Sequence, residues 1–184
     1  MSKQPTNVLA VCLGNICRSP MAEGLLRHHI QQRGLRCKVD SAGTSAHHAG
    51  EHPDRRAQQE MRRHGIDISK QTSRQLVRKD FERFDWILVM DRSNLANAQE
   101  LAGHNEAHLA KIKLFVADAE VPDPYYGGAE GFSQVFDMVD AAAERWATSD
   151  GSLAAGGDQK EGGWEEGCSC HLSWQLRPGS RLCF

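Results

Sequence analysis

The residues best suited to chemistry lie in one stretch of the chain, Cys12-Leu13-Gly14-Asn15-Ile16-Cys17-Arg18-Ser19. This stretch follows a short apolar run and precedes a segment with helical periodicity. Its unpaired backbone N–H groups therefore meet the positive end of a helix, where an anion is favoured. Five residues separate Cys12 from Arg18, about the number needed to wrap amides around a tetrahedral oxyanion, and Gly14 permits the backbone conformations that this requires. The stretch predicts a phosphate-binding loop.

Four side chains of this loop have predicted roles. A cysteine at a helix start and beside an arginine favours its thiolate form, so Cys12 is the predicted nucleophile. Arg18 offers a planar fork that can bind two phosphate oxygens. Ser19 is expected to cap the following helix and to donate its hydroxyl to the sulfur, and Asn15 to fix the turn. The alternative, a buried apolar cysteine with Arg18 as a surface charge, is disfavoured by the combined spacing.

A second segment, Val121-Pro122-Asp123-Pro124-Tyr125-Tyr126-Gly127-Gly128, carries a candidate acid. A nucleophile that displaces an oxygen leaving group needs a nearby acid to protonate that oxygen. Asp123 is the candidate because two prolines stiffen the loop around it, with an ordinary Asp-Pro turn as the alternative. Tyr125 and Tyr126 are predicted to form an aromatic wall beside the substrate, with exposed turn tyrosines as the alternative.

The elements that must position these residues follow from apolar patterning. Val8, Leu9, Ala10 and Val11 form a continuous apolar run such as a buried parallel strand shows. Strands that alternate with helices imply a parallel sheet in an α/β domain. The predicted strands are 7–12, 37–41, 85–90 and 111–116, and the predicted helices begin at Ser19, Asp54, Arg92 and Phe132 and end near Gly34, Met61, Leu101 and Trp146.

Composition bounds the class of protein. The chain has 184 residues with 22 basic and 24 acidic side chains, a net charge of -2, and no basic run, which argues against a nucleic-acid partner. The apolar run after the polar N-terminus is too short for a signal peptide or a membrane span, so a cytoplasmic protein without membrane insertion is expected.

Residues 1–148 are predicted to form one domain, and the glycine-rich segment 149–184 is predicted to form a disordered tail. Its Cys168-Ser169-Cys170-His171 cluster is too isolated for a metal site, and no metal is expected.

The segment from Val11 to Glu23, VCLGNICRSPMAE, resembles the signature of the low-molecular-weight protein tyrosine phosphatases, and the resemblance covers residues 7–148. It implies a doubly wound, four-stranded parallel sheet flanked by helices. It also implies hydrolysis of phosphotyrosine and aryl phosphates through a cysteinyl phosphate, with Asp123 as general acid and no cofactor. The expected partner is a phosphotyrosine-containing protein, for which an autophosphorylating tyrosine kinase is one candidate; no oligomeric state is implied. Ser41 matches a residue that hydrogen-bonds the phosphate loop.

Three positions qualify this resemblance. Cys17 is either a redox partner of Cys12, which the resemblance favours, or a thiol packed behind the loop. Gln71 stands where the family often has a histidine that braces the loop. His47, followed by His48, stands where many members place a bulky aromatic side chain beside the substrate pocket, so both positions bear on affinity and peptide preference.

Three other functions compete with this interpretation. An arsenate reductase of the same fold would relay a disulfide through later cysteines. Residues 69–101 contain none, which weakens this alternative, although Cys37 or an external thiol could substitute. Phosphoarginine phosphatases resemble this loop with threonine in place of Ile16, so Ile16 favours an aryl ester. A non-catalytic module that binds phosphorylated partners is the remaining alternative, and intact Cys12, Arg18 and Asp123 argue against it.

Overall fold

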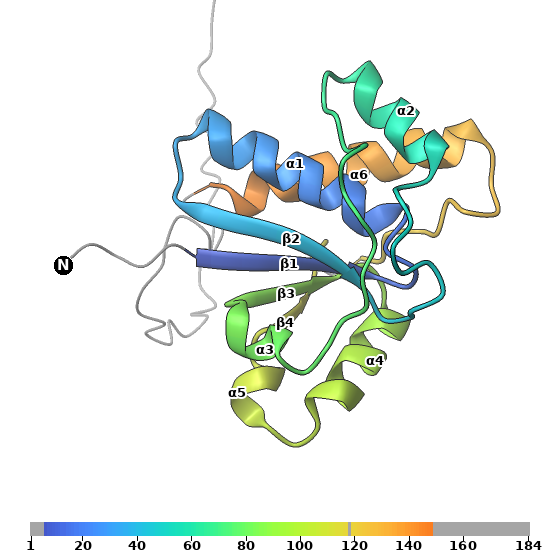
Figure 1. Cartoon of the computed structure of the whole chain (residues 1–184). Helices are drawn as coiled ribbons and strands as arrows, with labels where there is room; N and C mark the ends of the chain where they lie inside the picture. The colour runs from blue at the N-terminus through green and yellow to red at the C-terminus, as the bar shows by residue number, and fades with distance from the viewer. Residues whose placement is uncertain (1–5, 118, 149–184) are drawn as a thin grey trace, which may run out of the picture.

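The sheet is central to the architecture. The structure, a computed structural model, describes residues 6–117 and 119–148 (Figure 1). Four strands pair in the order β2-β1-β3-β4, all parallel. They are β1 (Thr6–Cys12), β2 (Cys37–Gly43), β3 (Trp86–Val89) and β4 (Ile112–Leu114). The chain runs outward from β1 to β2 and then crosses back to β3. The carboxyl end of β1 therefore lies at the switch point where doubly wound sheets bind ligands.

Helices cover both faces of this sheet. In Figure 1, α1 (Arg18–Gln32), α2 (Arg55–Arg63) and α6 (Ala129–Trp146) lie on one side, and α3 (Asp80–Arg83), α4 (Arg92–Ala102) and α5 (Glu106–Leu109) lie on the other. Each face of the sheet has its own hydrophobic core, and strand β1 contributes side chains to both. Val8 and Ala10 pack with the first group of helices, and Leu9 and Val11 pack with the second. The predicted fold class, a doubly wound four-stranded parallel sheet flanked by helices, is confirmed.

Most predicted elements form with small shifts at their ends. The Asp54 side chain caps α2 by accepting from the Arg56 backbone N–H at 2.8 Å, as predicted. Strand β2 extends two residues beyond the predicted end, to Gly43, and α6 begins at Ala129 rather than Phe132. The short helices α3 and α5 are not predicted, because four residues are too few to show a helical period.

The prediction that Ser19 caps α1 is wrong. The helix begins at Arg18, Cys17 is the N-cap residue, and no side chain makes a capping hydrogen bond there. The Ser19 hydroxyl is instead drawn into contacts around Cys12, as described below. The predicted tail, 149–184, lies outside the described residues. Among the residues that are described, no helix has both the length and the apolar character to cross a membrane.

Candidate active site

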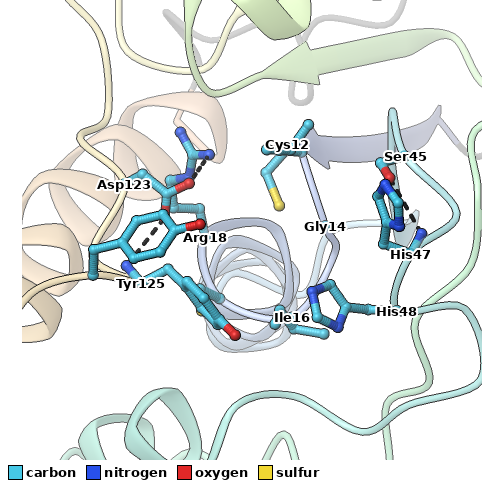
Figure 2. Close-up of a pocket in the computed structure, with 12 residues that line it drawn as sticks. Cys12, Gly14, Ile16, Arg18, Ser45, His47, His48, Asp123 and Tyr125 are labelled. Atoms are coloured by element: carbon cyan, nitrogen blue, oxygen red, sulfur yellow. Dashed lines mark hydrogen bonds and ion pairs between the residues drawn. The ribbon is translucent and has the colours of Figure 1, made fainter.

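The loop after β1 surrounds the sulfur of Cys12. The Asn15 backbone N–H donates to the Cys12 Sγ at 3.2 Å, and the Ser19 hydroxyl lies 3.1 Å from the same atom. Asn15 has a positive φ of 56°, the left-handed conformation that asparagine tolerates better than most residues. The sulfur lines a pocket of about 450 Å³. Figure 2 shows Arg18, Asp123 and Tyr125 on one side of this sulfur and Ser45, His47 and His48 on the other.

The side chain of Asn15 organises the hydrogen bonds behind the loop. Its Nδ2 donates to the Ser19 Oγ and to the Ser41 Oγ, both at 2.9 Å. Its Oδ1 accepts from the Arg74 backbone N–H at 2.9 Å. Since a thiolate has no hydrogen, the Ser19 hydroxyl must be the donor when Cys12 is ionised. Ser19 is thus close enough to donate its hydroxyl to the Cys12 sulfur, as predicted. Ser41 contacts the loop through Asn15, in agreement with the resemblance.

A buried carboxylate, absent from the predicted site, extends this network. The Ser41 hydroxyl donates to the Glu23 Oε2 at 2.6 Å, and the Glu23 Oε1 pairs with Arg27 at 2.7 Å. Burial raises the pKa of Glu23 above its ordinary value of 4.5, against the lowering effect of Ser41 and Arg27. A glutamate in the first turns of a helix ordinarily indicates a solvated face, so the helical pattern does not point to this buried role.

The raised pKa of Glu23 predicts a pH dependence of stability. Above pH 4.5 the unfolded chain releases this proton before the native protein does, so the native state binds more protons and its contribution to stability falls as pH rises. Glu23→Gln should remove this fall. Urea unfolding measures the free energy of unfolding of both proteins. We expect the value for the variant, minus the value for the parent, to increase as pH rises from 4.5. Glu82→Gln, at an exposed position, is the control; a difference that is constant with pH would contradict the assignment.

Two carboxylates hold the guanidinium of Arg18, which is only 3% exposed. Its Nη1 donates to the Asp91 Oδ2 at 2.6 Å and to the Val121 carbonyl at 3.2 Å, and its Nη2 donates to the Asp123 Oδ2 at 2.8 Å. Asp91 also caps α4 by accepting from the Asn94 backbone N–H at 2.7 Å. Asp91 is missing from the predicted site, although its position directly after the strand 85–90 and before a helix was a usable signal.

The loop 122–128 forms the wall of the pocket on the same side of Cys12 as Arg18 (Figure 2). The Asp123 Oδ1 accepts from the Tyr125 backbone N–H at 3.1 Å. The rings of Tyr125 and Tyr126 meet edge to face with centroids 5.0 Å apart, and both line the pocket. The structure therefore places the predicted acid and the predicted aromatic pair beside Cys12.

The facing wall carries two histidines. His47 and His48 both line the pocket. The His48 ring lies 6.2 Å from the Tyr125 ring, and its Nδ1 contacts the Glu51 Oε2 at 2.9 Å. A Cβ atom on Gly14 would come within 3.0 Å of His48, which gives this glycine a packing role. Four residues predicted to belong to the phosphate-binding loop line the same pocket: Leu13, Gly14, Ile16 and Cys17.

Support for the loop comes from the segment after Gln71, and this too was missed in part. The Ser73 hydroxyl donates to the Gly14 carbonyl at 3.0 Å. The Arg74 guanidinium is fixed by Asp40 and Asp80 at 3.0 and 2.9 Å. Its backbone N–H is thereby held against Asn15. The backbone carbonyl of Gln71 lies 3.0 Å from the Nδ1 of His52. Ser73 and Arg74 therefore brace the loop, whereas the family resemblance pointed to a histidine at position 71.

The three cysteines of the described residues, Cys12, Cys17 and Cys37, are free thiols. Burial raises the pKa of Cys17 well above its ordinary value, with Asp54 adding to the effect. Burial also raises the pKa of Cys37 to about 12. Both thiols are therefore poor nucleophiles. A regulatory bond between Cys12 and Cys17 stays a prediction. Over residues 6–117 and 119–148, no group of three or more His, Cys, Asp or Glu side chains is arranged to hold a metal ion.

Comparison with known proteins places this geometry in context. A family model described as low molecular weight phosphotyrosine protein phosphatase matches residues 7–155. The human protein named low molecular weight phosphotyrosine protein phosphatase is 42% identical over 144 residues, which cover 74% of this chain and 90% of the relative. A crystal structure of a protein tyrosine phosphatase from Entamoeba histolytica superposes with a TM-score of 0.71 at 38% identity, covering 76% of this chain and 92% of the other. A Drosophila arginine phosphatase superposes with a TM-score of 0.71 at 35% identity, covering 76% and 94%.

Proposed function

Because the chain belongs to the low molecular weight phosphotyrosine protein phosphatase family, we propose that it hydrolyses phosphotyrosine in proteins through a cysteinyl phosphate on Cys12. One observation carries this proposal: the thiol of Cys12, the guanidinium of Arg18 and the carboxyl of Asp123 line a single pocket at the carboxyl end of β1. A nucleophile, an anion-binding fork and an acid are the three groups that this reaction requires. We propose residues 1–148 as the catalytic domain.

In the first step, the phosphate group of the substrate occupies the loop. Backbone N–H groups and Arg18 bind its non-bridging oxygens, and Asp91 keeps the guanidinium oriented while the phosphate takes over the contact that Asp123 makes with Arg18. The Cys12 thiolate attacks phosphorus as the bond to the phenolic oxygen breaks. Protonated Asp123 gives its proton to that oxygen, and the free tyrosine side chain leaves.

In the second step, water cleaves the cysteinyl phosphate. Asp123, now a carboxylate, accepts a proton from the water as its oxygen attacks phosphorus, and the bond between sulfur and phosphorus breaks. Cys12 leaves as a thiolate, which the Ser19 hydroxyl at 3.1 Å and the Asn15 N–H at 3.2 Å can stabilise. Inorganic phosphate then departs, and Asp123 holds the proton needed for the next turnover.

The walls of the pocket support an aryl ester as the substrate. Tyr125, Tyr126 and His48 offer aromatic faces at the mouth, and Ile16 presents an apolar side chain beside the loop. A phosphotyrosine-containing protein is accordingly the proposed partner, with an autophosphorylating tyrosine kinase as one candidate. A cytoplasmic location fits that substrate and remains a proposal.

An assay of three reactions in parallel tests the proposal: hydrolysis of aryl phosphates, hydrolysis of phosphoarginine and reduction of arsenate. We expect rapid release of phosphate from p-nitrophenyl phosphate and from a phosphotyrosine peptide, and much slower release from a phosphoarginine peptide. The third reaction, reduction of arsenate with a thiol donor, should not proceed. Turnover of arsenate alone would favour a reductase, and preferred turnover of phosphoarginine would favour the activity named for the Drosophila relative. Phosphate binding without any turnover would favour a binding module.

A further inference from the structure

The loop that carries Asp123 is held by two arginines. Across residues 6–117 and 119–148, Arg18 and Arg56 are the only side chains from outside the loop 122–128 that hydrogen-bond to it. Arg18 reaches Asp123 near the start of the loop, and Arg56 Nη1 donates to the Gly127 carbonyl at 3.2 Å near its end. The two attachments differ in one respect: Arg18 is required by the substrate phosphate, and Arg56 is not.

Arg56 is itself fixed by a fork and by two aromatic rings. Its Nε and Nη2 donate to the two oxygens of Asp54 at 3.0 and 2.9 Å. Its Cζ lies 4.8 Å from the centroid of Phe132 and 5.6 Å from that of Tyr125. The hydrogen bonds from Arg56 hold the pKa of Asp54 below its ordinary value, so this carboxyl is ionised at neutral pH. A bidentate, stacked guanidinium of this kind is a rigid anchor, which lysine could not reproduce.

The anchor is also tied to the phosphate-binding loop. The backbone N–H of Asp54 donates to the Ile16 carbonyl at 2.8 Å. A continuous path therefore runs from Ile16 through Asp54 and Arg56 to Gly127 and the Tyr125 ring. From there, the Tyr125 backbone N–H donates to the Asp123 Oδ1 at 3.1 Å. The path joins the loop that holds the phosphate to the loop that holds the acid.

We propose that Arg56 is a positioning residue that keeps Asp123 aligned with the leaving oxygen once the substrate has drawn Arg18 away. This rests on the proposed function, since it assigns Arg56 a part in proton transfer by Asp123. Arg56 touches neither the phosphate nor the reacting atoms in this account. It acts on the acid loop, and it matters most when the leaving group needs the proton.

Leaving-group dependence provides the main test. We expect Arg56→Gln to lower kcat/KM for phenyl phosphate about tenfold or more, because small misplacement of a catalytic group is costly. The value of kcat/KM for p-nitrophenyl phosphate, whose leaving group needs little protonation, should change by less than about threefold. Arg55→Gln, at the exposed neighbouring position, should leave both rates unchanged. Equal losses for the two substrates would overturn the proposal, whereas a parent enzyme inactive on both would overturn the proposed function instead.

Three further measurements separate positioning from general loss of structure. In an Asp123→Asn background, Arg56→Gln should cause no further loss on phenyl phosphate, because the group it positions is absent. Vanadate affinity should be unchanged by Arg56→Gln. Free guanidinium at a non-denaturing concentration should restore phenyl phosphate turnover to Arg56→Ala, and Arg56→Lys should recover little. Additive losses, weakened vanadate binding in proportion to the lost rate, or failure of guanidinium rescue would each contradict the assignment.

Discussion

Replacing Cys12 with serine should lower the hydrolysis of p-nitrophenyl phosphate by at least about 10⁴-fold while the protein still binds vanadate. The loss follows because a serine hydroxyl is not ionised at neutral pH and attacks phosphorus far more slowly than a thiolate does. Binding should persist because the loop amides and Arg18 are unchanged. Steady-state kinetics and vanadate titration by calorimetry would measure the two effects separately.

Cys37→Ser is the matched control for this variant. Cys37 lies at the start of β2, where it pairs with Thr6, whereas Cys12 pairs with Gly43 at the other end of the same two strands. Its thiol is also a poor nucleophile, because burial raises its pKa to about 12. The control should keep the parent rate. Appreciable turnover by Cys12→Ser would mean that another group attacks phosphorus.

Asp123→Asn should show the second large effect, and it should depend on the leaving group. We expect kcat/KM for phenyl phosphate, which reports the steps up to departure of the phenol, to fall by about 10²- to 10⁴-fold, the range that a positioned general acid contributes, and kcat/KM for p-nitrophenyl phosphate to fall less. Asparagine can still accept from the Tyr125 backbone N–H, so the loop keeps one of its internal contacts. A plot of log(kcat/KM) against the pKa of the leaving phenol would measure the change as a steeper slope.

The control for this variant is Asp137→Asn, an exposed position on α6. It removes the same charge without touching the pocket, so its slope should match that of the parent. If Asp123→Asn lowered the rates of all phenyl esters by one common factor, Asp123 would not be the proton donor, and its role would be confined to holding Arg18.

The strands and most helices could be predicted because local patterns determine them. Val8 to Val11 is uniformly apolar, and the residues are fully buried on both faces of the sheet as a central parallel strand requires. Asp54 precedes a helical segment and caps it. Ser19 has the same local signature but fails as a cap, since its hydroxyl lies within hydrogen-bond distance of Cys12 and Asn15. Local propensity does not reveal that Cys12 and Asn15 compete with the helix N-terminus for the Ser19 hydroxyl.

The core of the candidate site was predictable for a different reason. Cys12, Arg18 and Ser19 lie within one loop, so their proximity follows from spacing alone, whereas that of Asp123 was expected from the family resemblance. The residues that were missed act over long sequence separations: Ser73 and Arg74 contact a loop that lies 59 residues away, and Arg56 reaches Gly127 across 71 residues. Their partners are set by how the connections pack, which periodicity does not encode.

Chemical trapping tests the cysteinyl phosphate most directly. The parent enzyme would be mixed with excess p-nitrophenyl phosphate, quenched in acid within the first turnovers, digested and mapped by mass spectrometry. We expect one phosphoryl group, on the peptide that contains Cys12, and none on that peptide in Cys12→Ser. A phosphoryl group on another residue, such as His47 or His48, or active enzyme with no covalent phosphate at any quench time, would contradict this expectation.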